Sequence, residues 1–174
     1  MMMVRMRGEN PVRALLSSLL ILAVPASAAV CPAKGAQAPL FSFPLAHGGR
    51  ISRADLLAKR QAAVISFWRH DCVPCRAELP ALQKLAAEWG DRVGVVIVHV
   101  GESEQEVLAF LDGQKLALSA ALDLSEKISR ERFCVSGLPR LFVLDAKGNL
   151  AKDMEGGVAN FEATLRAAVQ PLLH

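Results

Sequence analysis

Runs of consecutive apolar residues along the middle of the chain predict a buried β-sheet. The two longest are Ala63–Trp68, which is rich in β-branched and aromatic residues, and Val93–Val100. Runs of this length without polar alternation are typical of strands buried on both faces. Shorter apolar runs at Ala120–Leu122 and Leu141–Leu144 predict two more strands. A Gly-containing turn then leads into Leu150–Met154, which we expect to complete a hairpin.

Segments with apolar residues at helical intervals separate these runs. Pro74–Trp89 shows this spacing, and Gly90 behind it is a natural C-terminal cap. Sequences typical of N-terminal caps begin at Ser52 and Ser103. The other predicted helices cover Leu56–Lys59, the stretch after Ser103 to Gln114, Ser125–Phe133 and a C-terminal segment that begins at Asn160.

The order of these elements indicates the fold class. Strands that alternate with helices imply parallel pairing, with helices on both faces of the sheet. The late hairpin adds an antiparallel edge, and a lead-in segment with alternating Phe41 and Phe43 comes first. We therefore expect an α/β fold of three layers, with a central mixed β-sheet and helices on both faces. The length of 174 residues argues for one domain.

The N-terminus has the three parts of a secretory signal. Arg5, Arg7 and Arg13 form a positive region, Ala14–Val24 is apolar, and an A-x-A cleavage sequence ends at Ala28. We predict that residues 1–28 are a signal peptide and that residues 29–174 form the exported domain, in the periplasm or an equivalent compartment. The alternative is an uncleaved N-terminal membrane anchor. The apolar run is shorter than the roughly 20 residues that a spanning helix needs, which favours cleavage.

Composition and charge narrow the range of partners. Hydrophobic residues make up 52% and charged residues 21%, a balance typical of globular domains. The net charge of +3 is small and no basic run accompanies it, so we expect no nucleic-acid binding. We expect membrane contact only if the signal segment stays attached. Lipid attachment at Cys31 is a further alternative, although Val30 is not the small residue that such sites favour.

Cys72 and Cys75 form a C-x-x-C pair at the predicted start of a helix. The unpaired N–H groups and the positive dipole end of a helix N-terminus favour a thiolate, which is the nucleophile in disulfide exchange. We expect Cys72 to attack a partner disulfide and Cys75 to resolve the mixed disulfide. This chemistry needs no cofactor. Arg69, His70 and Arg76 would favour the Cys72 thiolate, whereas Asp71 would oppose it, and the sequence leaves the balance open.

The other cysteines and the histidines raise separate possibilities. Cys31 and Cys134 complete an even number of cysteines in the exported part, which suggests a structural disulfide between them; the alternative is two free or externally paired thiols. Zinc is disfavoured because none of the histidines is spaced as a ligand pair. His99 lies inside an apolar strand, where a core histidine is the simpler interpretation.

Two segments resemble the thioredoxin superfamily, and within it the exported TlpA/ResA-like thiol–disulfide oxidoreductases. Phe67–Pro80 resembles the signature F-W-x-x-W-C-x-P-C-R-x-E-x-P, and Val135–Asp145 is similar to V-x-G-x-P followed by F-x-(I/L)-D. The resemblance extends over roughly residues 35 to 172. It implies a thioredoxin-like fold and a redox-active disulfide centre. The first of the two segments is the more specific match.

The resemblance also implies how a partner is held. Pro139 is expected to be cis and to lie beside Cys72, and Leu138 to offer backbone groups to a partner strand. Trp68 and Arg140 are the further expected positioning residues, Arg140 as a cation near the partner groove. Members of this family reduce disulfides of exported proteins, often in cytochrome c biogenesis or oxidase assembly, with electrons from a membrane thiol carrier.

Three departures from the family pattern affect the partner and the redox potential. Asp71 replaces the usual Trp, and Arg140 replaces the Thr or Ser that often follows the cis-proline. Ser66 stands where thioredoxin has a buried acid that assists the resolving thiol. These changes leave the expected reaction type intact.

Reduction of an exported partner is the leading functional hypothesis. The first alternative is the same chemistry in the opposite direction, as a disulfide oxidase or isomerase. The second is a non-catalytic assembly factor that holds Cu(I) on Cys72 and Cys75, since soft thiolates suit Cu(I). Copper proteins of this fold use a wider cysteine spacing with a distant histidine, which disfavours that alternative. A peroxidase is disfavoured because no P-x-x-x-(T/S)-x-x-C sequence precedes either cysteine.

Overall fold

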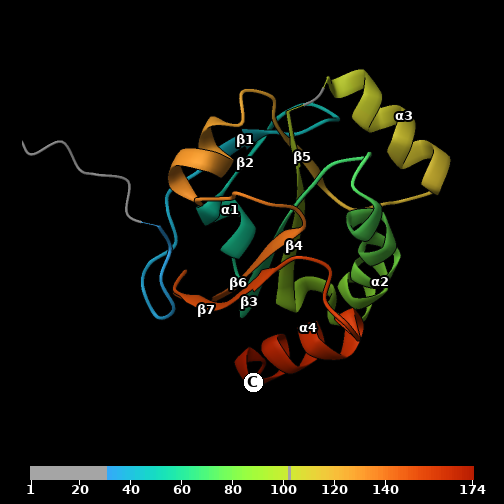
Figure 1. The fold of residues 1–174 in the computed structure, drawn as a ribbon. Helices are drawn as coiled ribbons and strands as arrows, with labels where there is room; N and C mark the ends of the chain where they lie inside the picture. The colour runs from blue at the N-terminus through green and yellow to red at the C-terminus, as the bar shows by residue number, and fades with distance from the viewer. Residues whose placement is uncertain (1–30, 102) are drawn as a thin grey trace, which may run out of the picture.

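A computed structural model describes residues 31–101 and 103–174 (Figure 1). The predicted signal peptide, residues 1–28, lies outside the described residues. None of the helices within the described ranges has the length and apolar character that crossing a membrane requires.

The elements are β1 (Ser42–Pro44), β2 (Arg50–Ser52), α1 (Arg53–Leu57), β3 (Ala62–Trp68), α2 (Val73–Trp89), β4 (Val93–Val100), α3 (Glu104–Gln114), β5 (Ala120–Asp123), the π-helix η2 (Ile128–Arg132), β6 (Arg140–Asp145), β7 (Leu150–Glu155) and α4 (Phe161–Val169), with short 3₁₀ turns η1 (Gly90–Arg92) and η3 (Gln170–Leu172).

The main sheet has five strands in the order β5-β4-β3-β6-β7. β3 pairs in parallel with β4, and β4 with β5, whereas β6 is antiparallel to both β3 and β7. Every residue of β3 is buried, as its largely apolar sequence predicts. The expected mixed sheet of a thioredoxin-like α/β fold is confirmed. β1 and β2 form a separate antiparallel pair in the lead-in region.

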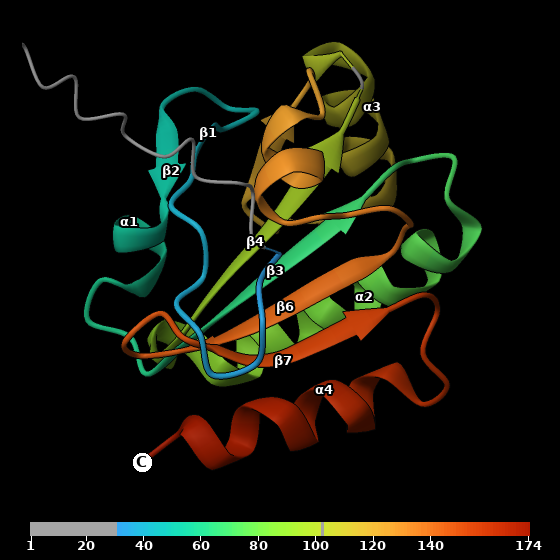
Figure 2. The same ribbon diagram turned by 60° about the vertical axis from the view of Figure 1, so that its left-hand side comes forward.

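Two hydrophobic cores lie on opposite faces of this sheet. One contains the apolar faces of α2, α3 and α4 together with Trp68 and Val64 from β3. The other contains α1, the residues after η2 and the lead-in segment, and it holds a cluster of phenylalanines. Figure 2 shows α2 behind the sheet and α4 along its β7 side. The phenylalanines, with ring centroids 5.1 to 6.3 Å apart, are Phe41, Phe43, Phe67, Phe133 and Phe142.

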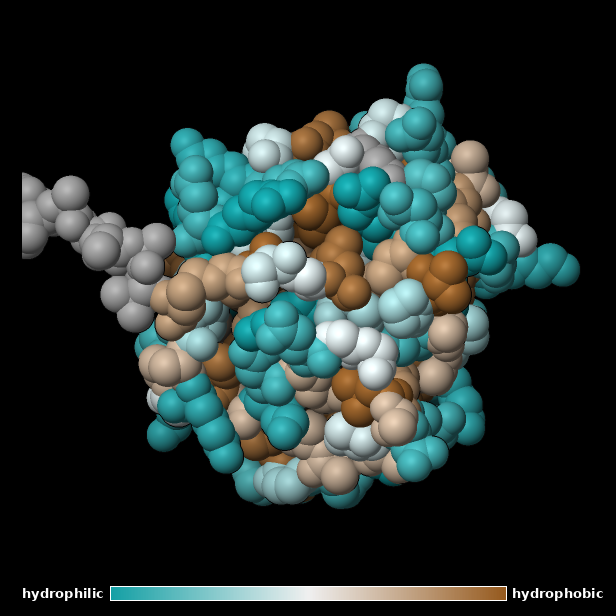
Figure 3. All heavy atoms as spheres, viewed as in Figure 1, coloured by the Kyte–Doolittle hydropathy of each residue, from teal (hydrophilic) through white to brown (hydrophobic). Residues whose placement is uncertain are grey.

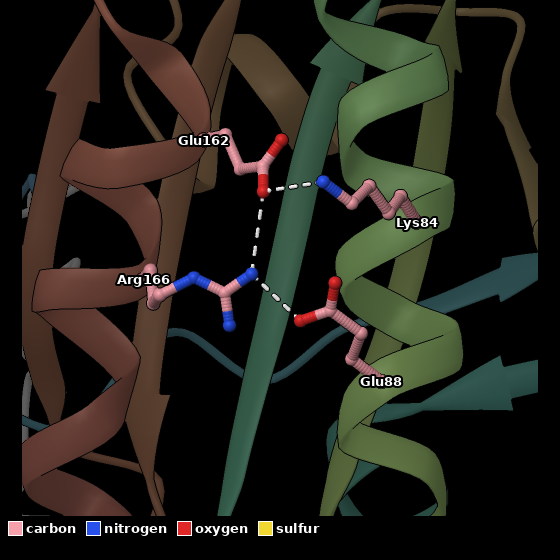
Figure 4. A network of polar contacts seen from close by, with 4 residues as sticks. All are labelled: Lys84, Glu88, Glu162 and Arg166. Carbon is pink, nitrogen blue, oxygen red and sulfur yellow. Dashed lines mark hydrogen bonds and ion pairs between the residues drawn. The ribbon is translucent and has the colours of Figure 1, made fainter.

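Polar contacts join α2 to α4 at the surface (Figure 4). The Nζ of Lys84 lies 2.9 Å from a carboxylate oxygen of Glu162, and Arg166 contacts both Glu162 and Glu88. The four side chains are roughly 40 to 60% exposed, so water screens these ion pairs. Leu165 and Val169 lie on the buried face of α4. Their burial therefore stabilises the packing of this helix more than its surface ion pairs do.

Two predicted helices differ from the observed structure. The short one around Leu56–Lys59 begins earlier, at Arg53, directly behind its Ser52 capping box, and it ends before Lys59 takes a left-handed backbone (φ 58°). The segment Ser125–Phe133 does not form a regular α-helix. The Phe133 N–H bonds the carbonyl of Ile128, five residues back, which makes this stretch a π-helix.

Candidate active site

The cysteine pair sits at the start of α2. Cys72 is the N-cap residue, and its Sγ accepts a hydrogen bond from the backbone N–H of Cys75 at 3.3 Å. The two side chains form a disulfide. The Cys72 sulfur thus lies at the positive end of the α2 dipole, a position that favours a thiolate over a thiol when a cysteine is reduced.

The two cysteines differ in access to solvent. Cys72 is half-buried, whereas Cys75 is only 1% exposed. Val73 between them is 72% exposed and carries an apolar side chain at the surface next to the disulfide. The face in Figure 3 shows hydrophobic residues scattered among hydrophilic ones. Cys72 is thus the more exposed cysteine of the pair.

The acidic neighbour of Cys72 is paired. Both carboxylate oxygens of Asp71 accept hydrogen bonds from Arg69, at 3.1 Å from Nε and 2.9 Å from Nη2. A two-point contact of this kind is the strongest geometry for an Arg–carboxylate pair. Arg69 and Asp71, which the sequence placed on opposite sides of the charge balance at Cys72, thus pair with each other.

Trp68 and His99 pack against each other in the core, and His99 stacks with His70 of the loop before Cys72. Trp68 is fully buried, so it has no direct access to a partner, and its ring packs edge-on against His99 with centroids 4.7 Å apart. His99 is also fully buried, as expected for a core histidine. Burial lowers the pKa of His99 from 6.5 to about 4, and the charges of His70 and Arg69 act in the same direction.

Glu78 is a buried carboxyl group one helical turn beyond Cys75. It is 9% exposed, and its Oε1 accepts a hydrogen bond from the backbone N–H of Val158 at 3.2 Å. Burial raises the pKa of Glu78, and the hydrogen bond from Val158 offsets part of this effect. Sequence reasoning passed over this residue as a site. The available signal was a charged residue on the otherwise apolar face of α2.

The loop before β6 forms the second part of the site. The Leu138–Pro139 peptide bond is cis, as the resemblance implies. Pro139 is buried, while Leu138 is half-buried and packs against both cores. A pocket of about 240 Å³ opens beside it, lined among others by Arg69, Ser136 and Leu138. This loop and the start of α2 lie at the same end of the sheet (Figure 2).

Arg140 follows the cis-proline, but its charge is largely compensated. Its Nη2 lies 2.6 Å from a carboxylate oxygen of Asp153, and its Nη1 contacts Glu155. The guanidinium also lies over the ring of Phe142, 5.5 Å from the ring centre. The positive charge that the sequence led us to expect near the partner groove is therefore held against β7.

A second disulfide joins Cys31 to Cys134, residues separated by 103 positions. It ties the lead-in segment to the residue that precedes the Val135–Pro139 loop. Cys134 takes a left-handed backbone with φ 52°. Within residues 31–101 and 103–174, no three His, Cys, Asp or Glu side chains come together as metal ligands.

Comparisons with known proteins link this site to disulfide exchange. The sequence profile of the AhpC/TSA family matches residues 34–153. The chain is 36% identical over 118 residues to the thioredoxin-like protein YneN of Bacillus subtilis (strain 168), covering 66% of this chain and 67% of YneN. It is 27% identical over 123 residues to the thiol-disulfide oxidoreductase ResA of Bacillus thuringiensis (strain Al Hakam), covering 70% of this chain and 69% of ResA. The crystal structure of a thiol:disulfide interchange protein of the thioredoxin family from Chlorobium tepidum TLS matches with a TM-score of 0.69 and 26% identity, covering 83% of this chain and 100% of that one.

Proposed function

The chain belongs to the AhpC/TSA family and is a thiol–disulfide oxidoreductase; we propose that it acts as a reductase of exported partner proteins through Cys72 and Cys75. The observation that carries this proposal is the asymmetry of the pair. Cys72 is half-buried at a helix N-terminus, and Cys75, three residues further along, is buried. A nucleophile must be reached by the partner, whereas a resolving thiol needs only to reach the first sulfur.

The first step forms a mixed disulfide. The Cys72 thiolate attacks one sulfur of the partner disulfide, a bond forms between the two sulfurs, and the second partner sulfur leaves as a thiolate that takes up a proton. The unpaired N–H groups at the start of α2 stabilise the attacking thiolate. Because Asp71 is held by Arg69, its carboxylate opposes this charge less than its position next to Cys72 suggests.

The second step needs a proton acceptor for the buried thiol. Glu78 is the candidate, because Cys75 and Glu78 are three residues apart on one buried helical face. A carboxyl group with a raised pKa is a stronger base than an ordinary one. Once Glu78 has taken the proton, the Cys75 thiolate attacks the Cys72 sulfur, the Cys72–Cys75 bond forms, and the partner leaves in its reduced state. Glu78 would serve in place of the acid that Ser66 replaces.

The residues around the cis-proline are proposed to hold the partner. Half-buried Leu138 is proposed to offer its backbone groups to a partner strand, and Pro139 to form the wall beside the cysteines. Arg140 is proposed to act through its ion pairs with β7, by fixing this loop, and Trp68 by supporting the loop from the core. The disulfide between Cys31 and Cys134 is proposed to be structural.

The cellular setting follows from the sequence. We propose that residues 1–28 direct export and that residues 29–174 work as one domain in the periplasm or an equivalent compartment. A reductase there must be recharged, and a membrane thiol carrier is the proposed electron source. Cytochrome c maturation and oxidase assembly are the proposed settings for its exported partner.

The reduction potential of the Cys72–Cys75 pair tests the direction of electron flow. Pairs of this fold span roughly −270 to −120 mV. Equilibration of the purified protein with a glutathione or dithiothreitol buffer, read by trapping free thiols and measuring mass, should give a value near the low end. A value near the high end would identify a disulfide donor or isomerase instead. A Cys31→Ser/Cys134→Ser variant should give the same potential, because the second disulfide is separate from the exchanging pair.

A further inference from the structure

The loop between β7 and α4 connects two parts of the candidate active site by backbone contacts. The N–H of Gly156 donates to the carbonyl oxygen of Pro139 at 2.9 Å. Two residues later, the N–H of Val158 donates to the carboxylate of Glu78 at 3.2 Å. The same short loop thus bonds both the cis-proline segment and the buried acid on α2. In Figure 2 this loop lies at the end of the sheet where α2 begins.

Gly157 between these two contacts lies against the cysteine motif itself. A Cβ atom at this position would be 3.0 Å from the Cβ of Pro74, which is tighter than nearly all real contacts between such atoms. The backbone of Gly157 is not in the left-handed region, so its small size, and not its conformational freedom, matters here. Any side chain at Gly157 must push the loop away from Pro74 by a few tenths of an ångström.

The Glu78 carboxyl group has its hydrogen-bond donor in this loop. Burial and the Val158 N–H are the causes of its perturbed pKa, and no charged side chain of the described residues is among them. On α2 the neighbouring titratable group is the reduced Cys75. The nearest acid at the start of α4, Glu162, is engaged with Lys84 and Arg166. Among residues 31–101 and 103–174, the Val158 N–H is therefore the polar contact that orients the Glu78 side chain.

We propose that the Gly156–Val158 loop positions Glu78 for the resolving step, with Gly157 as the residue whose lack of a side chain permits the contact. The proposal rests on the function proposed above. In this step the Cys75 thiol gives its proton to Glu78, and the Cys75 sulfur bonds to Cys72. The bond between Cys72 and the partner breaks, and its electron pair leaves with the partner sulfur, which takes a proton from water.

The test separates the two chemical steps. The reduced protein is mixed with a disulfide-linked peptide pair that carries a fluorophore and a quencher, so the fluorescence gain reports the first step. Acid quenching and intact mass then follow the decay of the mixed disulfide. Gly157→Ala is compared with the wild type, with Glu78→Gln and with Gly113→Ala. Gly113 lies in α3 with nothing near its Cβ position, so it is a matched glycine-to-alanine control.

Gly157→Ala should slow resolution about tenfold relative to the first step, because small displacements of a catalytic base are costly. Glu78→Gln should slow it about a hundredfold, in the usual range for removal of a general base. The double variant should be no slower than Glu78→Gln, since Gly157 acts through Glu78. Gly113→Ala should resolve at the wild-type rate. Additive losses in the double variant, or an unchanged relative rate in Gly157→Ala, would overturn the proposal.

A second measurement needs no glycine variant. The backbone amide of Val158 in the wild-type protein should change its NMR shift with pH as Glu78 titrates, with a midpoint above 4.5. Glu78→Gln should abolish this change. An amide of Val158 that does not follow the Glu78 titration would overturn the inference while leaving the exchange reaction intact. A wild-type protein that forms no mixed disulfide would instead overturn the proposed function itself.

Discussion

Removal of the Cys31–Cys134 disulfide should destabilise the protein mainly through the unfolded chain. The bond closes a loop across a separation of 103 residues, for which the chain-entropy account gives about 4 to 5 kcal/mol. The folded state should survive, because the lead-in segment has other anchors. The N–H of Gly35 bonds the carbonyl of Leu150 at 2.7 Å, and the N–H of Ala38 bonds that of Gly148 at 2.9 Å.

The assay is equilibrium urea unfolding followed by circular dichroism, with wild type compared to Cys31→Ser/Cys134→Ser. The free energy of unfolding should fall by about 4 kcal/mol. The m-value, the slope of this free energy against urea concentration, should rise because the unfolded chain without the crosslink exposes more surface. Cys72→Ser/Cys75→Ser is the matched control. Its bond spans a separation of only 3 residues, so the same account gives about 2 kcal/mol. A loss for Cys31→Ser/Cys134→Ser no larger than that of the control would refute the reasoning.

Two further predictions concern stability. Because the pKa of His99 falls from 6.5 to about 4 on folding, the unfolded chain binds this proton more readily, and stability should drop by up to about 3 kcal/mol as the pH falls from 6.5 to 4. His99→Phe should flatten this part of a pH series of urea midpoints, and an unchanged slope would contradict the assignment. Gly94→Ala should cost about 3 kcal/mol or more, because its Cβ would lie 2.0 Å from the carbonyl oxygen of Leu56. Gly113→Ala in open space should be neutral or slightly stabilising by thermal unfolding, and similar midpoints for the two variants would count against the packing argument.

The sheet was predictable from the sequence because local patterns determine it. The apolar run of β3 is broken only by Ser66 and that of β4 only by His99, so both favour strands that are buried on both faces. The capping boxes at Ser52 and Ser103 form as expected, since each needs only residues within one turn. The position of Cys72 at the start of α2 was likewise set by local spacing.

The features that the sequence did not reveal depend on distant contacts. The partner of Glu78 is Val158, 80 positions away, and no local pattern encodes that hydrogen bond. The positive charge of Arg140 is compensated by carboxylates of β7. The register of β7 against β6, which brings them opposite Arg140, is not evident from the sequence. The π-helix η2 depends on a shift of one residue in hydrogen bonding, which apolar spacing over so short a segment does not distinguish from an α-helix.

Trapping of the mixed disulfide tests the central claim most directly. Cys75→Ala, reduced and then mixed with a disulfide-linked peptide, should accumulate a covalent adduct that peptide mapping places on Cys72. Cys72→Ala should form almost none, because its remaining thiol is 1% exposed. An adduct on Cys75 in Cys72→Ala at a comparable rate, or no adduct on Cys72 in Cys75→Ala, would contradict the assignment of Cys72 as nucleophile and Cys75 as resolving thiol.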